Sequence, residues 1–201
     1  MKDPTEYPPT KAKLLNAAER LMLTKGFSAT SVDEICEAAK LTKGSFFHYF
    51  ESKDRLGQEL LERFAASAEA TQRAGGSDDS DPLKRVFGHV EVALTLAKSS
   101  RSSLGCLLGV FAQELSDTHP AIRSVCARAF KQWARRLKAD LDAAKARYAP
   151  RADIDTMSLA QHFIAVVEGS KILARAEQDT RLVERSLTHF RRYVEALFKR
   201  R

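Results

Sequence analysis

Residues Thr42–Phe50 read TKGSFFHYF, and this stretch decides how the rest of the chain is interpreted. It combines four Phe and Tyr rings with one lysine and three hydroxyls, and no Asp or Glu stands between Ala38 and Phe50. Such a stretch is too polar for a simple core and too aromatic for a simple surface. It predicts a short helix that rests some rings on a core and presents its other side chains to a polyanion.

The residues before this stretch predict a second short helix. Ser31 followed by Glu34 forms a capping box, which starts a helix at Val32. Lys40 and Leu41 leave room only for a tight turn before Thr42, which caps the next helix. Two short helices joined by a tight turn form a helix-turn-helix motif, in which the second helix enters the major groove of DNA.

The remaining sequence predicts an all-α protein of about nine helices. Apolar residues recur at helical spacing in every long segment, and neither a strand pattern nor an internal repeat is present. We expect a flexible arm over residues 1–9 and a three-helix helix-turn-helix domain over 10–55. The fourth helix, which Ser52 caps, is expected to run to about residue 73. A larger helical domain should then occupy 75–201.

The charge of the chain points to an anionic partner but does not locate it. The formal net charge is +7, yet residues 1–64 hold ten basic and ten acidic side chains. Any DNA contact in this part of the chain must therefore depend on a local cluster of basic side chains. Three widely spaced cysteines favour a reducing cytoplasm over a disulfide framework, and neither a signal-peptide pattern nor a membrane-spanning apolar run is present.

Three segments of the chain resemble a known family. They are GFSATSVDEI at 26–35, KGSFFHYF at 43–50 and SKDRL at 52–56. Together they are similar to the N-terminal DNA-binding domain of TetR/AcrR-type transcriptional regulators, and the match covers about Thr10–Leu61. Two departures stand out. Lys40 occupies a turn position where the family often has Gly, so a positive φ there would be mildly strained. Phe46-Phe47 replaces an aliphatic-tyrosine pair.

The resemblance and the geometry of the motif assign roles to ten residues at the DNA interface. Side chains that face the groove would be Thr42, Lys43, Ser45, Phe46 and His48, with Gly44 allowing close approach of the backbone. Phosphate contacts would come from Tyr49, Lys53, Thr30 and Ser31. For each hydroxyl the alternative is a plain helix cap. Phe50 and one of Phe46 or Phe47 are expected to lie in the core.

The resemblance also implies a repressor that is released from a palindromic operator when a small-molecule effector binds. The same resemblance assigns effector binding and dimerisation to residues 75–201, and homodimerisation is expected through the last two helices, at about 153–176 and 180–199. Residues that could line an effector pocket are Cys106, Leu107, Phe111, Trp133, Phe163, Val167 and Glu168. Ordinary core packing is the alternative for each of them. The Glu168 carboxylate could pair with a cationic ligand or with arginines of the protein.

Cys106 supports a second hypothesis for the signal. It resembles a cysteine at the start of the sixth helix in an electrophile- and oxidant-responsive branch of the family. Near a helix N-terminus and Arg101, it could react as a thiolate. The alternative is a small buried apolar residue, a common role for cysteine.

Other classes of protein fit the sequence less well. Cys106 with His89, His119 or His162 would be needed for an enzyme, but no local motif links them. The chain has no HExxH sequence, no paired CxxC and no glycine-rich phosphate loop, so we expect no catalysis, metal or cofactor. An adaptor that binds only protein would not need the lysine- and hydroxyl-bearing stretch without acids.

Overall fold

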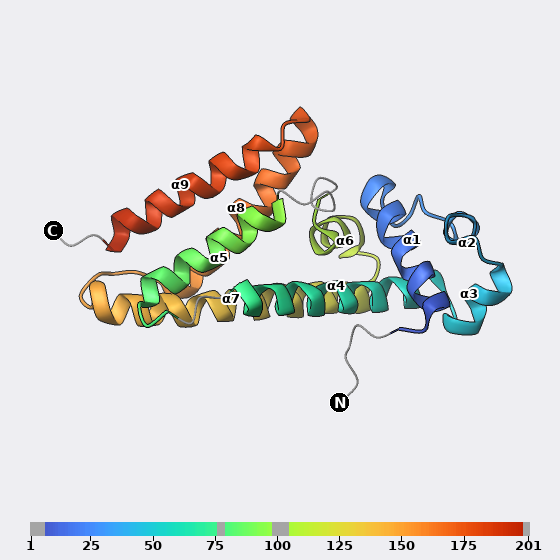
Figure 1. Ribbon diagram of the computed structural model, residues 1–201, viewed down its shortest axis with the longest axis horizontal. Coiled ribbons are helices and arrows are strands. Elements are labelled where there is room, and N and C mark those ends of the chain that lie inside the picture. The colour runs from blue at the N-terminus through green and yellow to red at the C-terminus, as the bar shows by residue number, and fades with distance from the viewer. Residues whose placement is uncertain (1–6, 76–78, 98–104, 199–201) are drawn as a thin grey trace. The chain divides into compact units, whose positions relative to one another are not determined.

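The computed structural model describes residues 7–75, 79–97 and 105–198, and over these ranges it contains nine helices and no strand (Figure 1). The all-α prediction is therefore confirmed. The helices are α1 (Pro9–Lys25), α2 (Val32–Ala39), α3 (Lys43–Tyr49), α4 (Lys53–Gly75), α5 (Pro82–Ala97), α6 (Leu107–Leu115), α7 (Pro120–Tyr148), α8 (Thr156–Glu177) and α9 (Arg181–Phe198).

The chain divides into two compact units whose segments alternate along the sequence. The first unit contains α1–α3, α4 as far as Ala68, and the segment Cys106–Ala129 with α6 and the start of α7. The second unit contains the rest of α4 and α7 together with α5, α8 and α9. The expected division near residue 75 would have placed α6 with the second unit.

Local capping signals set the ends of the short helices. The Ser31 hydroxyl accepts the Glu34 backbone N–H at 3.2 Å, while the Glu34 carboxylate accepts the Ser31 N–H at 2.8 Å, which confirms the capping box. Lys40 ends α2 with φ of 56°, in the left-handed conformation expected to be mildly strained. Thr42 accepts the Ser45 N–H at the start of α3, as predicted.

The core of the first unit is built from leucines of α1 and α4 and from aromatic rings of α3. Leu14, Leu15, Leu56 and Leu60 are fully buried. The rings of Phe46 and Phe50 lie 5.6 Å apart in the same core. Because both rings are inaccessible, they hold α3 and the residue that follows it against this core, while Lys43, Phe47 and His48 of α3 remain exposed.

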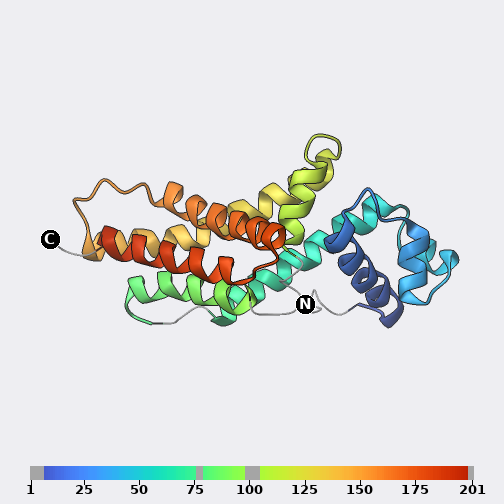
Figure 2. The same ribbon diagram turned by 90° about the horizontal axis from the view of Figure 1, so that it is seen from above.

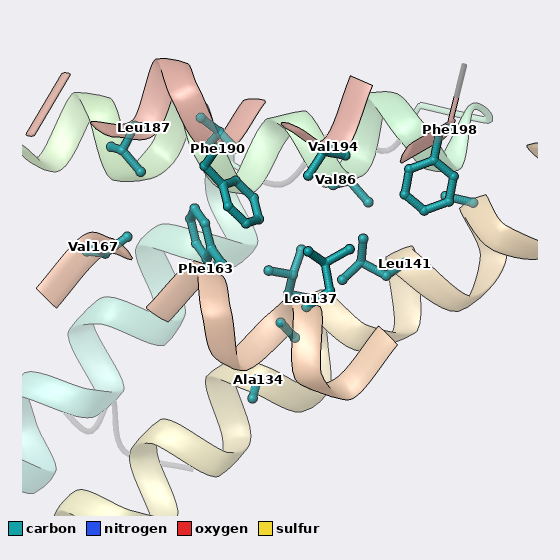
Figure 3. Packing of buried hydrophobic residues seen from close by; sticks show 14 of the residues in the cluster. Val86, Ala134, Leu137, Leu141, Phe163, Val167, Leu187, Phe190, Val194 and Phe198 are labelled. Atoms are coloured by element: carbon teal, nitrogen blue, oxygen red, sulfur yellow. The ribbon is translucent and has the colours of Figure 1, made fainter. Parts of the chain in front are cut away.

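The second unit has its own core, formed where α5, α7, α8 and α9 meet (Figure 3). Phe163 of α8 contacts Phe190 of α9 with ring centroids 5.0 Å apart, and Leu137 and Leu141 of α7 lie beside them. Helices α8 and α9 run side by side (Figure 2). Asp140 of α7 accepts a hydrogen bond from Arg85 of α5 at 2.7 Å, so α5 and α7 are also joined by an ion pair.

Several expectations lie wholly or partly outside the described residues. They include most of the flexible arm over 1–9. Arg101, which was expected near Cys106, is also outside the described ranges.

Candidate nucleic-acid interface

The outer face of α3 gathers side chains suited to reading DNA. Lys43, Gly44, Phe47 and His48 are exposed, and they fall at the spacing of one side of a helix. No acidic residue lies on this helix. One surface therefore carries the ammonium of Lys43, the imidazole of His48 and the ring of Phe47. Gly44 has no side chain that would keep a ligand away from the backbone.

The two adjacent phenylalanines have opposite environments. Phe46 is fully buried, whereas Phe47 is 57% exposed, although their rings touch edge to face at 5.2 Å. A side chain without accessible atoms cannot reach a base edge, so the groove-facing set is revised: Phe47 takes the exposed position expected of Phe46. The expectation that one of the pair lies in the core holds for Phe46. Which of two neighbouring aromatic residues turns inward depends on the exact start of α3, set by the Thr42 cap.

Lys43 forms an ion pair across the turn of the motif. Its Nζ lies 2.8 Å from Oδ1 of Asp33, in the first turn of α2, and both side chains are 64% exposed. The hydrogen bond to Asp33 raises the pKa of Lys43, so the ammonium is fully charged near neutrality. Asp33 was not among the predicted site residues, because ten positions separate it from Lys43 and no local pattern links them.

The hydroxyls of Thr42 and Ser45 serve the helix end that they stand on. The Thr42 oxygen accepts the Ser45 N–H at 3.2 Å and lies 3.1 Å from the Ser45 hydroxyl. Thr42 is exposed and Ser45 is half-buried. The Thr42 hydroxyl therefore caps α3, and the Ser45 hydroxyl contacts it without capping the helix. Tyr49 is half-buried, with its ring 4.7 Å from that of His48.

Two predicted phosphate ligands instead bind the protein backbone. The Lys53 ammonium donates to the carbonyl of Phe27 at 3.0 Å and to that of Thr30 at 2.9 Å, and it lies 4.4 Å from the centre of the Phe27 ring. Thr30 is fully buried, and its hydroxyl donates to the Gly26 carbonyl at 2.7 Å. Both side chains therefore shape the loop Gly26–Thr30 ahead of α2.

The start of α2 carries a strongly perturbed carboxylate. A hydrogen bond from the Lys25 ammonium, together with those from the backbone and hydroxyl of Ser31, lowers the pKa of Glu34 to about 2. Ser31 itself is exposed. Its hydroxyl is engaged by Glu34, so the capping role is established, and any phosphate contact would have to share that oxygen.

A residue of α6 completes the loop that precedes α2. The Glu114 carboxylate accepts the backbone N–H of Phe27 at 2.8 Å and that of Ser28 at 2.7 Å. Burial acts to raise the pKa of Glu114, but hydrogen bonds from the hydroxyl and backbone of Ser28 and from the backbone of Phe27 outweigh it, and the pKa is lowered. The partners are more than eighty residues apart, so the sequence offered no signal for this contact.

The residues expected to line an effector pocket fall into both compact units. Cys106, Leu107 and Phe111 belong to the first, where the buried Phe111 ring contacts Phe27 at 5.5 Å. Cys106 occupies the N-cap position of α6 and is 7% exposed. Trp133, Phe163, Val167 and Glu168 belong to the second unit.

Within the second unit the predicted effector residues pack closely. The rings of Trp133 and Phe163 meet edge to face at 5.8 Å, and Val167 is buried. Glu168 is the exception, because its Oε1 is buried without a hydrogen bond among the described residues. Lys171 lies 3.5 Å from that oxygen and supplies a positive charge, so a lysine one turn away takes the place of the arginines that were one of the two alternatives for Glu168.

A surface hollow of about 340 Å³ lies where the start of α8 meets the end of α9. It is lined by Asp153, Ile154, Asp155, Ser158, Leu159, His162, Tyr193 and Leu197. None of the residues predicted to bind an effector belongs to this lining. Asp155 caps α8 by accepting the N–H groups of Met157 and Ser158, so one of the two carboxylates is already engaged.

Comparison with known proteins assigns the family. Residues 14–60 match the family described as bacterial regulatory proteins, tetR family, and residues 82–190 match the tetracyclin repressor-like C-terminal domain. The chain belongs to the TetR family of transcriptional regulators. It is therefore a DNA-binding regulator with a helix-turn-helix, as the sequence predicted, and α2 and α3 are the two helices of that motif.

Relatives of this TetR-family regulator match it over most of its length. The HTH-type transcriptional repressor DhaR of Mycobacterium sp. strain GP1 is 27% identical over 90% of this chain and 89% of its own. The transcriptional regulator AcuR of Cereibacter sphaeroides is 30% identical over 82% and 75% of the two chains. The transcriptional repressor NemR of Escherichia coli K12 is 25% identical over 92% and 94%.

Solved structures agree with this assignment. The regulatory protein TetR from Rhodobacter sphaeroides superposes with a TM-score of 0.81 and 28% identity over 92% of this chain and 99% of its own. The reduced form of E. coli NemR gives a TM-score of 0.76 and 25% identity over 91% and 95%. Among the described helices of the regulator, none combines the length and apolarity that crossing a bilayer requires.

Proposed function

We propose that this regulator represses transcription by binding a palindromic operator as a homodimer, and that a small-molecule effector releases it. Its site of action would be the cytoplasm, where its DNA target lies. The observation that carries the DNA contact is the division of α3 into two faces. Phe46 and Phe50 fix the helix from inside, and the outer face presents Lys43, Phe47 and His48 without any acidic residue.

The contacts fall into two groups with different consequences for specificity. Lys43 and His48 provide donors for base edges, Phe47 provides an apolar surface for a thymine methyl, and Gly44 lets the backbone approach. Thr42, Ser45, Tyr49 and Ser31 provide hydroxyls for phosphates at the edge of the groove. Lys53 and Thr30 act indirectly in this proposal, since they position the loop Gly26–Thr30.

An assay of DNA binding tests this assignment. Wild-type protein is used to select duplexes from a randomised pool, and relative affinities are then measured for Lys43→Ala. We expect Lys43→Ala to alter the base preference, whereas Tyr49→Ala should weaken binding to all duplexes by a similar factor. Lys131→Ala is the matched control, because this exposed lysine of α7 lies in the second unit. A Lys43→Ala protein that retains the wild-type ranking of duplexes would refute base reading by Lys43.

The proposed dimer surface lies on α8 and α9. Ile172 and Leu173 of α8 and Tyr193 of α9 are each about half exposed, although all three are large and apolar. Ala165, Gly169 and Ala176 continue the same side of α8 at helical spacing, and a Cβ at Gly169 would meet no atom within 4 Å. A stripe with small residues and few charges suits close packing against the same stripe of a second copy about a two-fold axis.

Dimerisation matters for function because the two half-sites of a palindrome lie about one helical turn, or roughly 34 Å, apart. We expect Leu173→Glu to shift the protein toward monomer in analytical ultracentrifugation and to weaken operator binding by at least tenfold. Arg175→Glu is a control on the same helix, since helical spacing places this exposed residue outside the stripe. Dimers that persist unchanged in Leu173→Glu and in a Tyr193→Glu variant would rule out this surface.

The effector site is proposed around the aromatic pair of the second unit. Trp133 and Phe163 offer flat apolar surface, and the Glu168 oxygen, which accepts no hydrogen bond among the described residues, would attract a cationic group in competition with Lys171 at 3.5 Å. Glu168→Gln should therefore weaken the response to cationic aromatic compounds while leaving DNA binding intact. Quenching of fluorescence from Trp133, the single tryptophan, reports binding directly.

Cys106 is the alternative trigger. It stands at the N-cap of α6, and the other end of the same helix carries Glu114, which holds the loop ahead of α2. Modification of the thiol would enlarge a nearly buried side chain at that helix start. N-ethylmaleimide should then release wild-type protein from DNA but not Cys106→Ser. Equal release of both proteins would exclude this trigger.

A further inference from the structure

The ion pair between Asp33 and Lys43 joins the two helices of the DNA-binding motif at the surface that faces DNA. Lys43 is the first residue of α3, and Asp33 is the second residue of α2. Their side chains meet at 2.8 Å while remaining 64% exposed. The only lysine in α3 is therefore held by a carboxylate.

This contact changes what the lysine offers to a nucleic acid. Sequence-independent binding comes from basic side chains that neutralise phosphates and release counterions. A lysine paired with a carboxylate contributes little net charge to that process. Its ammonium has three N–H donors, however, so it can keep one on Asp33 and still present two to acceptors on a base edge. The pair thus disfavours phosphate contact more than base contact.

We infer that Asp33 is a specificity-determining residue of the DNA interface, which acts by holding Lys43 toward the bases and away from the phosphate backbone. The inference rests on the proposed role of Lys43 in reading bases and names the group that directs it. Asp33 makes no DNA contact of its own in this scheme. It is a positioning residue, and its effect on binding requires Lys43.

A simpler role for Asp33 would be to stabilise α2. Acidic residues in the first turn interact favourably with the positive end of the helix dipole. Glu34 occupies the same turn and forms the capping box, so α2 keeps an acidic first turn without Asp33. A role confined to the helix end would change the stability of the protein but would not depend on Lys43, and this difference makes the two roles separable.

The experiment compares one operator duplex, selected from a randomised pool by the wild-type protein, with a shuffled duplex of the same length. For Asp33→Asn we expect affinity for the shuffled duplex to rise about two- to fivefold, the range for an exposed ion pair. Operator affinity should stay within about twofold, so the specificity ratio falls. For the shuffled duplex, the slope of log affinity against log salt concentration should become more negative by about 0.9 per bound chain, because one more lysine reaches a phosphate.

Two further variants isolate the pair. Glu37→Gln removes the same charge from an exposed position of α2. It should change the affinities for the two duplexes by equal factors that are smaller than the effect of Asp33→Asn on the shuffled duplex. In a Lys43→Gln background, Asp33→Asn should have no more effect than Glu37→Gln has. An Asp33→Asn effect that is equal on both duplexes, or that persists without Lys43, would overturn the inference. Thermal unfolding of each variant verifies that the protein remains folded.

These outcomes also separate the inference from the proposal on which it rests. If Lys43→Gln leaves the ranking of duplexes unchanged, Lys43 does not read bases and the proposed interface fails first. If Lys43→Gln changes the ranking while Asp33→Asn behaves like Glu37→Gln, the interface stands and only the role of Asp33 is lost.

Discussion

The carboxylate of Glu114 in α6 accepts the backbone N–H of Phe27 at 2.8 Å, in the loop that leads into the DNA-binding motif. The neighbouring Ser28 N–H binds the other oxygen of the same carboxylate. The Lys53 ammonium donates hydrogen bonds to the carbonyls of Phe27 and Thr30. The backbone N–H groups of the loop thus bind the Glu114 carboxylate, and its carbonyls bind the Lys53 ammonium. Glu114 belongs to α6 and Lys53 to α4.

Glu114→Ala should loosen this loop. Two backbone N–H groups would lose a charged acceptor, and because the site is partly exposed we expect a loss of about 1 kcal/mol in the free energy of unfolding. DNA affinity should fall as well, since α2 begins directly after the loop. Urea denaturation and fluorescence anisotropy with labelled DNA measure the two effects. Gln113→Ala, a truncation of an exposed neighbour, should change neither.

Gly26→Ala should be destabilising for two physical reasons. The backbone at Gly26 has φ of +89°, a conformation that residues with a Cβ adopt at a cost, and the added Cβ would lie 2.8 Å from the Glu114 carboxylate. We expect a loss of about 1–2 kcal/mol by chemical denaturation. Combining Gly26→Ala with Glu114→Ala should cost less than the sum of the single changes, because the clash disappears. Strict additivity would contradict the contact.

Gly44→Ala should separate folding from DNA binding. The added Cβ in α3 would meet only the Thr42 hydroxyl at an ordinary 3.7 Å, and alanine favours a helix by up to about 1 kcal/mol. Thermal stability should therefore stay the same or increase. DNA affinity should nevertheless fall by at least fivefold if the backbone approaches the groove at this position. A stable variant with unchanged affinity would show that Gly44 has no part in the interface.

Lys53→Ala should act mainly on stability. Removing the ammonium takes a charged donor from the carbonyls of Phe27 and Thr30, and only the Phe27 carbonyl keeps another partner among the described residues, the Thr30 N–H at 3.1 Å, so we expect a loss of about 1–2 kcal/mol. The slope of log affinity against log salt should remain at the wild-type value if Lys53 binds the backbone in the complex too. A slope reduced by about 0.9 per chain would mean that Lys53 contacts a phosphate when DNA is bound.

Glu34 gives stability that depends on pH. Its folded pKa of about 2 lies below its usual value of 4.5, so its contribution is fully present above the usual value and is lost as pH falls toward 2. Glu34→Gln retains a capping side chain but not the charge. The difference in thermal midpoint between wild type and Glu34→Gln should be largest near pH 7 and should shrink steadily below pH 5. A difference independent of pH would indicate that charge is not responsible.

The sequence predicted the features that depend on neighbouring residues. Capping at Ser31 and Thr42, the left-handed turn at Lys40 and the inward position of Phe50 all follow from short-range patterns. These features determine where α2 and α3 begin and end. They were therefore sufficient to place the recognition helix, and the family comparison supports the function inferred from it.

The features that escaped prediction depend on residues far apart in the sequence. Glu114 contacts a loop 86–87 residues earlier, and the pair of Asp33 with Lys43 crosses a turn whose geometry the sequence does not encode as a motif. Lys53 resembled a phosphate ligand because its position at the start of α4 suits an anion, but a lysine stem is long enough to reach two carbonyls of the protein.

The alternation of segments between the two compact units bears on how the protein is made and how it can be recombined. A chain emerging from the ribosome contains α1–α3 early, but it lacks Phe111 and Glu114 until α5 and α6 have also been synthesised. The DNA-reading half therefore acquires its last supports only after part of the other half exists. An exchange of operator preference between relatives at a single junction near residue 75 would separate Phe27 from its partners. Transplanting residues 105–129 along with the first 68 would keep them together.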